Sequence, residues 1–217
     1  MAESLRLYGY WRSSSSWRVR IALALKGLDY EAVPVHLVRG GGEQLSPEHR
    51  ERNPQALVPV LEHGDFRLSQ SLAICEYLDS LAPEPRLLPS EPRAAAQCRS
   101  LCQLIACEIQ PLNNLRVLRY LESELGADKS QQAIWYRHWI SLGFAALESV
   151  LARDNSPHAL GSEPGLLDLM LVPQLYNARR FDCELSPYPR LLALEEAALA
   201  LPAFANTAPE QQPEAER

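Results

Sequence analysis

Residues 11–27 read WRSSSSWRVRIALALKG, and this stretch decides the fold because four serines lead directly into a segment of helical periodicity. Serine is a preferred N-cap residue, and Gly27 suits the position just after a helix. Apolar side chains recur with a period of about 3.6 residues, at Trp17, Ile21, Ala24, Leu25 and Leu28. The stretch therefore predicts a helix that is covered on two sides, by a sheet and by another element.

Short predicted strands surround this helix in the sequence. Four segments read as strands, at residues 5–10, 30–37, 58–61 and 66–69. A turn at residues 63–65 joins the last two into a hairpin, and further helices are expected to begin at Ser46 and Ser71. The order βαβ followed by ββα predicts an α/β domain with a mixed sheet that ends near residue 81.

A proline-rich segment follows the α/β domain. Pro83, Pro85 and Pro89 mark a linker over residues 83–90. Beyond it only helical periodicity is found, in the segments 91–122, 129–153, 165–181 and 189–201. We therefore expect the following parts: an α/β domain over residues 1–82, an all-helical domain over residues 91–204, and a tail without a core over residues 205–217.

The overall composition excludes several classes of protein. The 217 residues include 27 acidic and 21 basic side chains, a net charge of −6, which argues against a nucleic-acid binder because such a protein needs a basic face. No apolar run approaches the roughly 20 residues that cross a bilayer. The first residues carry no apolar signal core, so we expect a cytoplasmic protein with no membrane partner.

The cysteines and histidines suggest no metal centre. Five cysteines, an odd number, fit a reducing compartment with free thiols. Cys98, Cys102 and Cys107 fall in one predicted helix without a second ligand pair, and we interpret them as small buried apolar residues. The five histidines, His49 included, form no motif and receive no role.

Two serine-containing helix starts could hold an anion, residues 13–16 and Gln70-Ser71. The first N–H groups of a helix lack internal partners and the dipole is positive there, so a nearby hydroxyl can help to stabilise a thiolate or a carboxylate. From these residues alone, plain N-capping is the favoured interpretation of both. Arg116 and Arg179-Arg180 would add to an anion site if they returned to the first helix start, but surface solvation is favoured.

Val58-Pro59 is a third feature. Proline within a strand removes a ladder donor and usually marks an edge. An edge strand leaves the N–H and C=O groups of Val58 free to pair with an extended peptide, and an ordinary edge strand that resists aggregation is the alternative. The residues alone do not indicate a cis bond, which occurs in only ~5–6% of X–Pro bonds.

Taken together, these segments resemble the zeta class of glutathione transferases, the family of maleylacetoacetate isomerase. Residues 10–23 are similar to its class-specific signature Ser-Ser-Cys-x-x-Arg-Val-Arg-Ile-Ala-Leu. Other segments resemble its glutathione-binding and second-domain motifs: Asn53-Pro54, Val58-Pro59, 70–74, 109–114 and 171–174. The likeness runs from about residue 5 to about residue 204. It implies an α/β plus all-α fold, in which a thioredoxin-like N-terminal domain precedes an all-helical C-terminal domain.

The resemblance implies that glutathione is the cofactor. The matching positions are Gln44, Val58, Pro59, Gln70, Ser71, Gln110 and Asn114. Pro59 is expected to be cis, which exposes the Val58 backbone to the cysteinyl part of glutathione. Gln70 and Ser71 are expected to hold the γ-glutamyl end.

The resemblance also assigns catalytic and substrate-binding positions. Ser13 and Ser14 match hydroxyls that face the sulfur, and Ser15 stands where the family usually has cysteine, so no enzyme thiol acts at that position. Arg180 matches a residue that binds a substrate carboxylate. Arg12 and Arg116 are expected to help hold a dicarboxylate substrate.

The implied activity is the glutathione-dependent cis–trans isomerisation of maleylacetoacetate to fumarylacetoacetate in the breakdown of tyrosine, phenylalanine or aromatic acids, carried out by a homodimer. A maleylpyruvate isomerase is one alternative, but relatives with that activity tend to carry His where this chain has Gln110. A general transferase acting on α-haloacids is another. A non-catalytic binding protein of the same fold is a third, and the intact Ser13, Val58-Pro59 and Gln70-Ser71 argue against it.

One departure from the family concerns a helix start. Gly165 stands where the family has threonine, so half of an N-capping box with Asp168 is missing. We expect a loss of stability of a few tenths to about 1 kcal/mol and no effect on the chemistry.

Overall fold

The computed structural model describes residues 4–215, and its backbone divides into two compact units. One unit runs to Leu87 and also includes the segment from Ala200, and the other spans Leu88–Leu199. The boundary lies inside the linker predicted over residues 83–90. Within the described range, no helix is long and apolar enough to cross a membrane.

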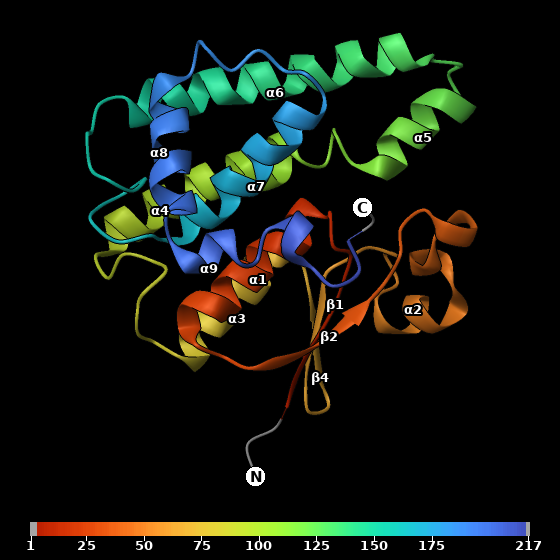
Figure 1. Ribbon diagram of the computed structural model, residues 1–217, viewed down its shortest axis with the longest axis horizontal. Coiled ribbons are helices and arrows are strands. Elements are labelled where there is room, and N and C mark those ends of the chain that lie inside the picture. The colour runs from red at the N-terminus through yellow and green to blue at the C-terminus, as the bar shows by residue number, and fades with distance from the viewer. Residues whose placement is uncertain (1–3, 216–217) are drawn as a thin grey trace. The chain divides into compact units, whose positions relative to one another are not determined.

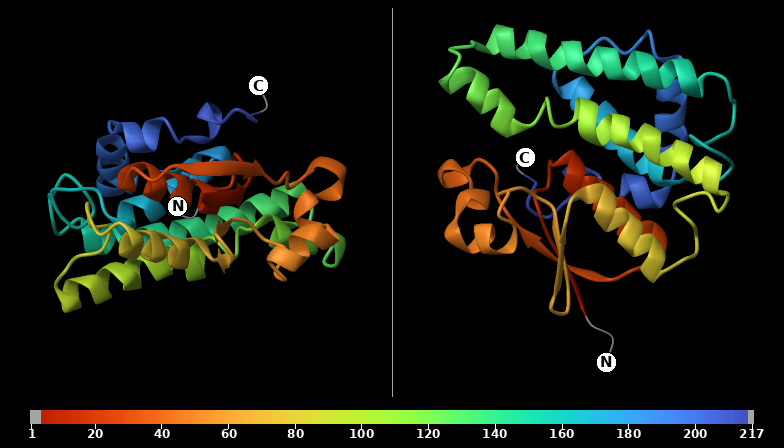
Figure 2. Two further views of the ribbon diagram at one scale, coloured as in Figure 1. Left: turned by 90° about the horizontal axis from the view of Figure 1, so that it is seen from below. Right: turned by 180° about the vertical axis from the view of Figure 1, so that it is seen from behind.

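The first unit contains the mixed sheet that the sequence predicts (Figure 1). Its strands are β1 (Leu5–Gly9), β2 (Tyr30–Pro34), β3 (Val60–His63) and β4 (Phe66–Ser69), in the order β2-β1-β3-β4. β1 is parallel to β2 and antiparallel to β3, and β3 and β4 form the predicted hairpin, which is seen from behind in Figure 2. The mixed α/β prediction is confirmed.

Helices lie on both faces of this sheet. Side chains of neighbouring strand residues point to opposite faces of the sheet, so the surroundings of Gly9 and of Tyr8 show what covers each face. A Cβ atom at Gly9 would lie 3.1 Å from the Ser16 hydroxyl oxygen, which places helix α1 (Ser14–Lys26) tightly against that face. Helix α3 (Ser71–Leu81) packs beside α1. On the other face, the Arg52 guanidinium of helix α2 (Pro47–Arg52) lies 4.6 Å from the ring centroid of Tyr8.

The ends of α1 and α2 follow the sequence signals. Ser13 caps α1, and Gly27 ends it in the left-handed conformation, with φ 61°. Ser46 caps α2, with Pro47 in the first turn as predicted. Two short 3₁₀ turns, η1 (Arg39–Gly41) and η2 (Glu43–Leu45), separate β2 from α2.

The C-terminal segment does not behave as the predicted tail. Helix α9 (Pro202–Ala205) packs on α1, with Phe204 fully buried, and a 3₁₀ turn, η4 (Pro209–Gln211), follows. The Trp17 indole N–H donates to the Thr207 hydroxyl at 3.0 Å, and Arg20 Nε donates to the Thr207 carbonyl at 3.1 Å. The prediction of a coreless tail over residues 205–217 is therefore wrong for the described part, because the hydrogen bonds to Thr207 and the burial of Pro209 anchor a polar sequence.

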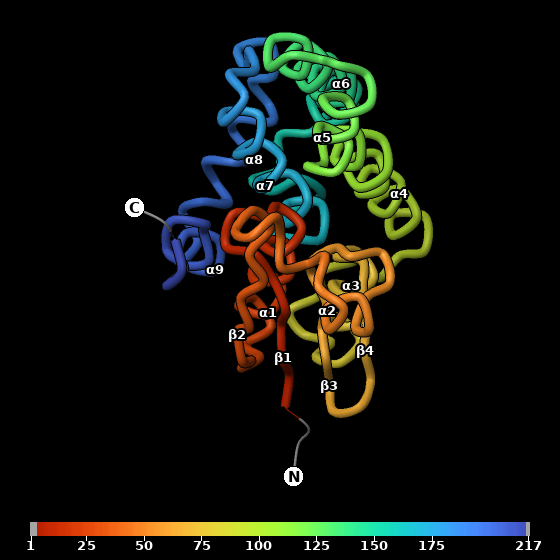
Figure 3. The backbone as a smooth tube through the Cα atoms, turned by 90° about the vertical axis from the view of Figure 1, so that its right-hand side faces the viewer, coloured from red at the N-terminus to blue at the C-terminus, as the bar shows by residue number. Residues whose placement is uncertain are grey.

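The second unit is all-helical, as predicted. Its helices are α4 (Pro92–Gln103), a π-helical segment η3 (Leu104–Ile109), α5 (Leu115–Ser123), α6 (Lys129–Leu151), α7 (Leu166–Arg180) and α8 (Pro189–Leu199). Helix α7 is central, because every residue over 166–175 is buried and the helix contacts α4, η3 and α8 (Figure 3). Cys98 and Cys102 are buried as interpreted, whereas Cys107 is exposed.

The helix predicted over residues 91–122 is interrupted. The Gln110 N–H donates to the Ile105 carbonyl five residues back, which is the π-helical pattern. Asn114 then caps α5, accepting from the Arg116 N–H at 3.1 Å. Apolar residues keep their helical spacing through residues 104–114, so the sequence pattern gave no sign of this interruption.

At the start of α7, Asp168 accepts from the Gly165 N–H at 2.9 Å, so only the carboxylate half of the expected capping box is present.

Candidate functional site

The start of α1 brings the serine run to one end of the sheet. The Ser13 hydroxyl oxygen accepts from the Ser16 N–H at 3.2 Å, which confirms the capping prediction. A hydroxyl that accepts in this way still has its own hydrogen to donate. Ser13 is half-buried, and Ser14 and Ser15 are buried. Capping and anion binding are therefore compatible at Ser13.

Backbone contacts hold the segment in front of α1 in place. The Ser13 N–H donates to the Tyr10 carbonyl at 3.0 Å, and the Tyr10 N–H donates to the Ser16 hydroxyl at 3.3 Å. Arg20 donates to the Trp11 carbonyl at 2.9 Å, and burial lowers the pKa of Arg20 to about 10. The Arg12 side chain, half-buried, lies with its guanidinium 4.8 Å from the Trp11 ring centroid. The Ser13 hydroxyl is thus held before any ligand arrives.

The Val58-Pro59 bond is cis, as the family resemblance implies. The edge-strand interpretation is wrong, because Pro59 lies just before β3, and β3 runs between β1 and β4. At that position the missing proline N–H interrupts no ladder. Over residues 4–215, no hydrogen bond uses the backbone N–H or C=O of Val58. The backbone groups predicted to meet a peptide are therefore free.

The start of α3 lacks the serine cap that the sequence favours. Gln70 occupies the cap position with φ 73°, and no side chain in the described part of the chain caps the helix there. The Gln70 amide donates to Gln55 at 2.8 Å. The Ser71 hydroxyl accepts from Arg18, a buried guanidinium, at 3.3 Å. Uncapped N–H groups with a buried cation behind them favour binding of a carboxylate.

Gln44 is buried 14 residues before Val58 in the sequence. Its Oε1 atom has no hydrogen-bond partner among residues 4–215, and its Nε2 atom is 3.5 Å from the Leu37 carbonyl. A buried acceptor without a partner costs free energy unless a ligand or water satisfies it. Gln44 thus fits a role as a ligand contact.

The register of the strands brings the start of α1, the Val58-Pro59 segment and the start of α3 to the same end of the sheet. Tyr8, Val60 and Ser69 lie side by side across β1, β3 and β4. The next residues along each strand, outward from that row, lead to Ser13, to Val58 and to Gln70. The structure thus gathers the segments of Ser13, Val58 and Gln70 at one end of the sheet, which residue spacing could not establish because the three segments are far apart in the chain.

The remaining predicted residues belong to the second unit. Gln110 is half-buried at the end of the π-helical segment, a distortion that is frequent at functional sites. Asn114 caps α5, and Arg116 is exposed in its first turn. Arg180, exposed at the end of α7, approaches Asn177 at 3.5 Å. The roles of these four residues toward glutathione and substrate stay predictions.

His49 makes a contact, with the residue next to Val58, that the sequence analysis did not predict. Its Nε2 atom lies 3.0 Å from the Leu57 carbonyl oxygen, next to Val58 in the chain. A histidine outside any motif gives no sequence signal for such a contact. Only the three-dimensional position of His49 on α2, beside the loop that contains Leu57, reveals this contact.

Comparisons with known proteins agree with this geometry. The family described as "Glutathione S-transferase, N-terminal domain" matches residues 3–80. A probable maleylacetoacetate isomerase of Vibrio cholerae is 50% identical over 98% of this chain and 99% of its own. A maleyl pyruvate isomerase, a bacterial zeta-class glutathione S-transferase, was solved in a holo structure and is 43% identical over 97% of this chain and 100% of that one, with a TM-score of 0.94. A maleylacetoacetate isomerase of Anaeromyxobacter dehalogenans, solved with glutathione in its active site, is 44% identical over 99% of both chains, with a TM-score of 0.89.

Proposed function

The chain belongs to the zeta class of the glutathione S-transferase family, and from this premise we propose that it is a glutathione-dependent isomerase converting maleylacetoacetate to fumarylacetoacetate. The observation that carries the proposal is the free Val58 backbone at the same sheet end as the serine-capped start of α1. Relatives that cover almost the whole chain and are named for this activity support it.

The residues at this end of the sheet fit glutathione. Val58 offers an N–H and a C=O to the extended cysteinyl part, as an added strand would use them. The uncapped start of α3, with Ser71 and the buried Arg18 behind it, suits the γ-glutamyl carboxylate. Gln44 provides a buried acceptor that lacks a partner among residues 4–215.

When bound, glutathione supplies a thiolate that adds reversibly to the conjugated double bond, so that rotation about a single bond becomes possible. The protein must favour that thiolate, because a free thiol is mostly protonated at neutral pH. Ser13 does this by donating its hydroxyl hydrogen toward the sulfur, and the positive end of α1 adds to the effect. Ser14 contributes from the same turn, while Ser15 takes no covalent part.

We further propose that arginines bind the dianionic substrate. Arg12 lies next to the serine-capped start of α1, half-buried, and forms no ion pair within the described residues. Arg116 and Arg180 are exposed cations assigned by the family pattern. Guanidinium groups suit carboxylates because they can donate two parallel hydrogen bonds. Gln110 and Asn114 are proposed to complete the glutathione contacts.

Maleylpyruvate is the second candidate substrate, because a structurally similar relative carries that name. The two activities separate in one experiment, in which purified protein is given maleylacetoacetate, maleylpyruvate or an α-haloacid, with and without glutathione. We expect the highest kcat/KM with maleylacetoacetate and no turnover without glutathione. A higher value for another substrate would reassign the reaction, and glutathione binding without any turnover would favour the non-catalytic binding protein.

We also propose that the protein is a cytoplasmic homodimer. The family resemblance supports the dimer, and the five cysteines, an odd number that fits a reducing compartment with free thiols, support the location. Light scattering during gel filtration should give twice the 24.3 kDa mass of one chain. A mass of one chain at all concentrations would contradict the dimer, and recovery of the native protein in a membrane or periplasmic fraction would contradict the location.

A further inference from the structure

The peptide unit between Leu57 and Val58 controls how the proposed glutathione contact is presented. The Val58 N–H and the Leu57 C=O belong to this same unit, and the bond is not among the cis bonds of the chain. In a trans peptide the C=O and the N–H point in opposite directions within one plane. Any group that fixes the Leu57 carbonyl therefore also fixes the direction of the free Val58 N–H.

Two side chains fix that carbonyl. His49 Nε2 donates to the Leu57 oxygen at 3.0 Å, and Asn53 Nδ2 donates to the same oxygen at 2.9 Å. A carbonyl oxygen can only accept, so the hydrogen of this contact must lie on the histidine nitrogen. Both side chains belong to residues that are only 3% exposed, so water competes little for either bond. The Leu57 carbonyl is therefore held from two directions.

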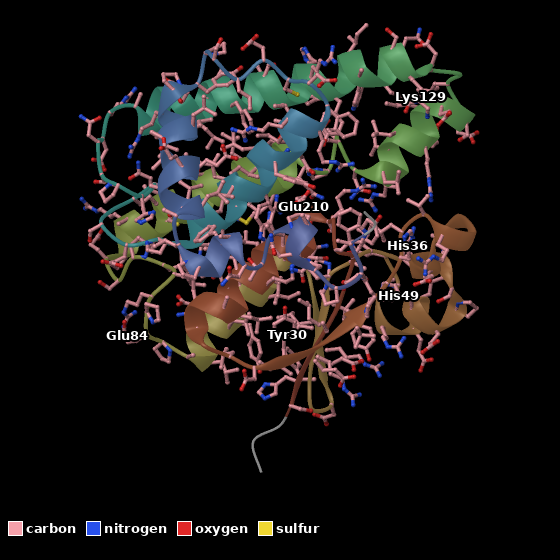
Figure 4. All side chains as sticks on the ribbon, in the orientation of Figure 1. Tyr30, His36, His49, Glu84, Lys129 and Glu210 are labelled. Carbon is pink, nitrogen blue, oxygen red and sulfur yellow. The ribbon has the colours of Figure 1, made fainter. Side chains whose placement is uncertain are left out.

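The donors themselves are anchored. The Asn53 side chain is fixed at its other end, where its Oδ1 accepts from the Gln55 N–H at 3.1 Å. His49 lies on α2, as Figure 4 shows, and its backbone C=O accepts from the Asn53 N–H at 2.8 Å, so the two donors are also joined to each other. Helix α2 is tied to the sheet where Arg52 covers the Tyr8 ring. The position of the Leu57 carbonyl is thus set by a rigid element and not by the loop alone.

We propose that His49 is a positioning residue, which holds the 57–58 peptide so that the Val58 backbone is presented to the cysteinyl part of glutathione. This inference rests on the proposed function, because it assumes that Val58 is the glutathione contact. His49 does not touch glutathione or the reacting atoms. It acts by removing the freedom of the peptide, so that the loop is already ordered when glutathione binds.

The test compares His49→Leu, which removes the donor, with His49→Gln, whose amide nitrogen can occupy a position near that of Nε2. We expect His49→Leu to raise the glutathione Kd from calorimetry and the glutathione KM by roughly 3- to 10-fold, as for loss of one neutral hydrogen bond. The KM for maleylacetoacetate and kcat should stay within about twofold, and His49→Gln should recover most of the affinity.

Ser46→Ala is the matched control, because it removes the α2 cap that bonds the His49 N–H but leaves the Nε2 donor. It should lower Tm as much as a lost cap does and leave glutathione binding within about twofold. An equal loss of affinity in Ser46→Ala and His49→Leu would overturn the proposal, since α2 stability alone would then explain it. An unchanged Kd in His49→Leu would also overturn it.

A measurement without glutathione separates this inference from the proposed function. Hydrogen exchange at Gln55 and Ala56, whose N–H groups donate to Asn53, should be faster in His49→Leu than in the wild type. Exchange that does not change would show that the loop needs no support from His49, and the inference would fall. A wild type that binds no glutathione would instead remove the proposed function, whatever the exchange result.

Discussion

The starts of α1 and α3 carry similar sequence signals and reach different structures. Ser13 caps α1 through its hydroxyl oxygen, and the residue is in an extended conformation, with φ −72°. At α3 the cap position is Gln70, with φ 73°, and the Ser71 hydroxyl faces a buried arginine instead of the helix backbone. A serine near a helix start therefore predicts a polar helix end, but its partner depends on the backbone at the preceding residue.

This difference suggests separate chemical tasks for the two helix starts. Ser13 keeps a hydroxyl hydrogen to donate while its oxygen is occupied, which suits a group that becomes negatively charged during the reaction. At Ser71 the oxygen accepts from Arg18, so a guanidinium is in place beside this helix start before any ligand arrives. We expect changes at the first start to affect kcat and changes at the second to affect the glutathione KM.

Ser13→Ala should have the largest effect. Loss of one donor toward a developing anion should lower kcat by roughly 10²–10³-fold. Loss of the α1 cap should also lower the free energy of unfolding by about 1 kcal/mol. Steady-state kinetics and urea denaturation measure the two effects. Ser15→Ala is the control in the same turn and should change kcat much less, so equal and small effects in both variants would refute the role of Ser13.

Ser71→Ala should have the next largest effect, and on a different parameter. Loss of a hydroxyl beside a bound carboxylate should raise the glutathione KM about tenfold, as for a hydrogen bond to a charged group, with kcat little changed. Ser80→Ala is a matched control on α3, since its exposed hydroxyl bonds, among residues 4–215, only the Glu76 carbonyl. If Ser71→Ala lowered kcat as Ser13→Ala does, the two helix starts would share one task.

Gln70→Gly tests whether the backbone conformation at the start of α3 is strained. A non-glycine residue at φ 73° and ψ 109° stores roughly 1–3 kcal/mol of strain. Glycine removes that strain but loses more entropy on folding and loses the bond to Gln55. We expect the free energy of unfolding to rise by a few tenths to about 1 kcal/mol, while the glutathione KM rises. A fall in stability like that of Ser13→Ala would instead show that the lost Gln55 bond and the entropy cost of glycine outweigh the backbone strain at Gln70.

Much of the fold, and part of the site, could be predicted from the sequence. Local signals such as Ser13, Gly27 and Pro47 worked because caps and turns depend on a few adjacent residues. Contacts across the chain could not be predicted this way. The bond from Arg18 to Ser71 and the bond from Arg20 to Thr207 join residues far apart in sequence, and no pattern of spacing encodes either pair.

A third helix start, at α7, provides the smallest prediction. Gly165 has extended backbone, with φ −128°, and offers no hydroxyl, while Asp168 accepts from its N–H at 2.9 Å. Because extended backbone suits a capping threonine, Gly165→Thr should complete the capping box and raise the free energy of unfolding by a few tenths to about 1 kcal/mol. Isomerase kinetics should not change, since the chemistry is assigned elsewhere. Stabilisation with altered kcat would mean that α7 is coupled to the reacting groups, and no stabilisation would mean that the two bonds Asp168 accepts, from Gly165 and Ala159, already satisfy this helix start.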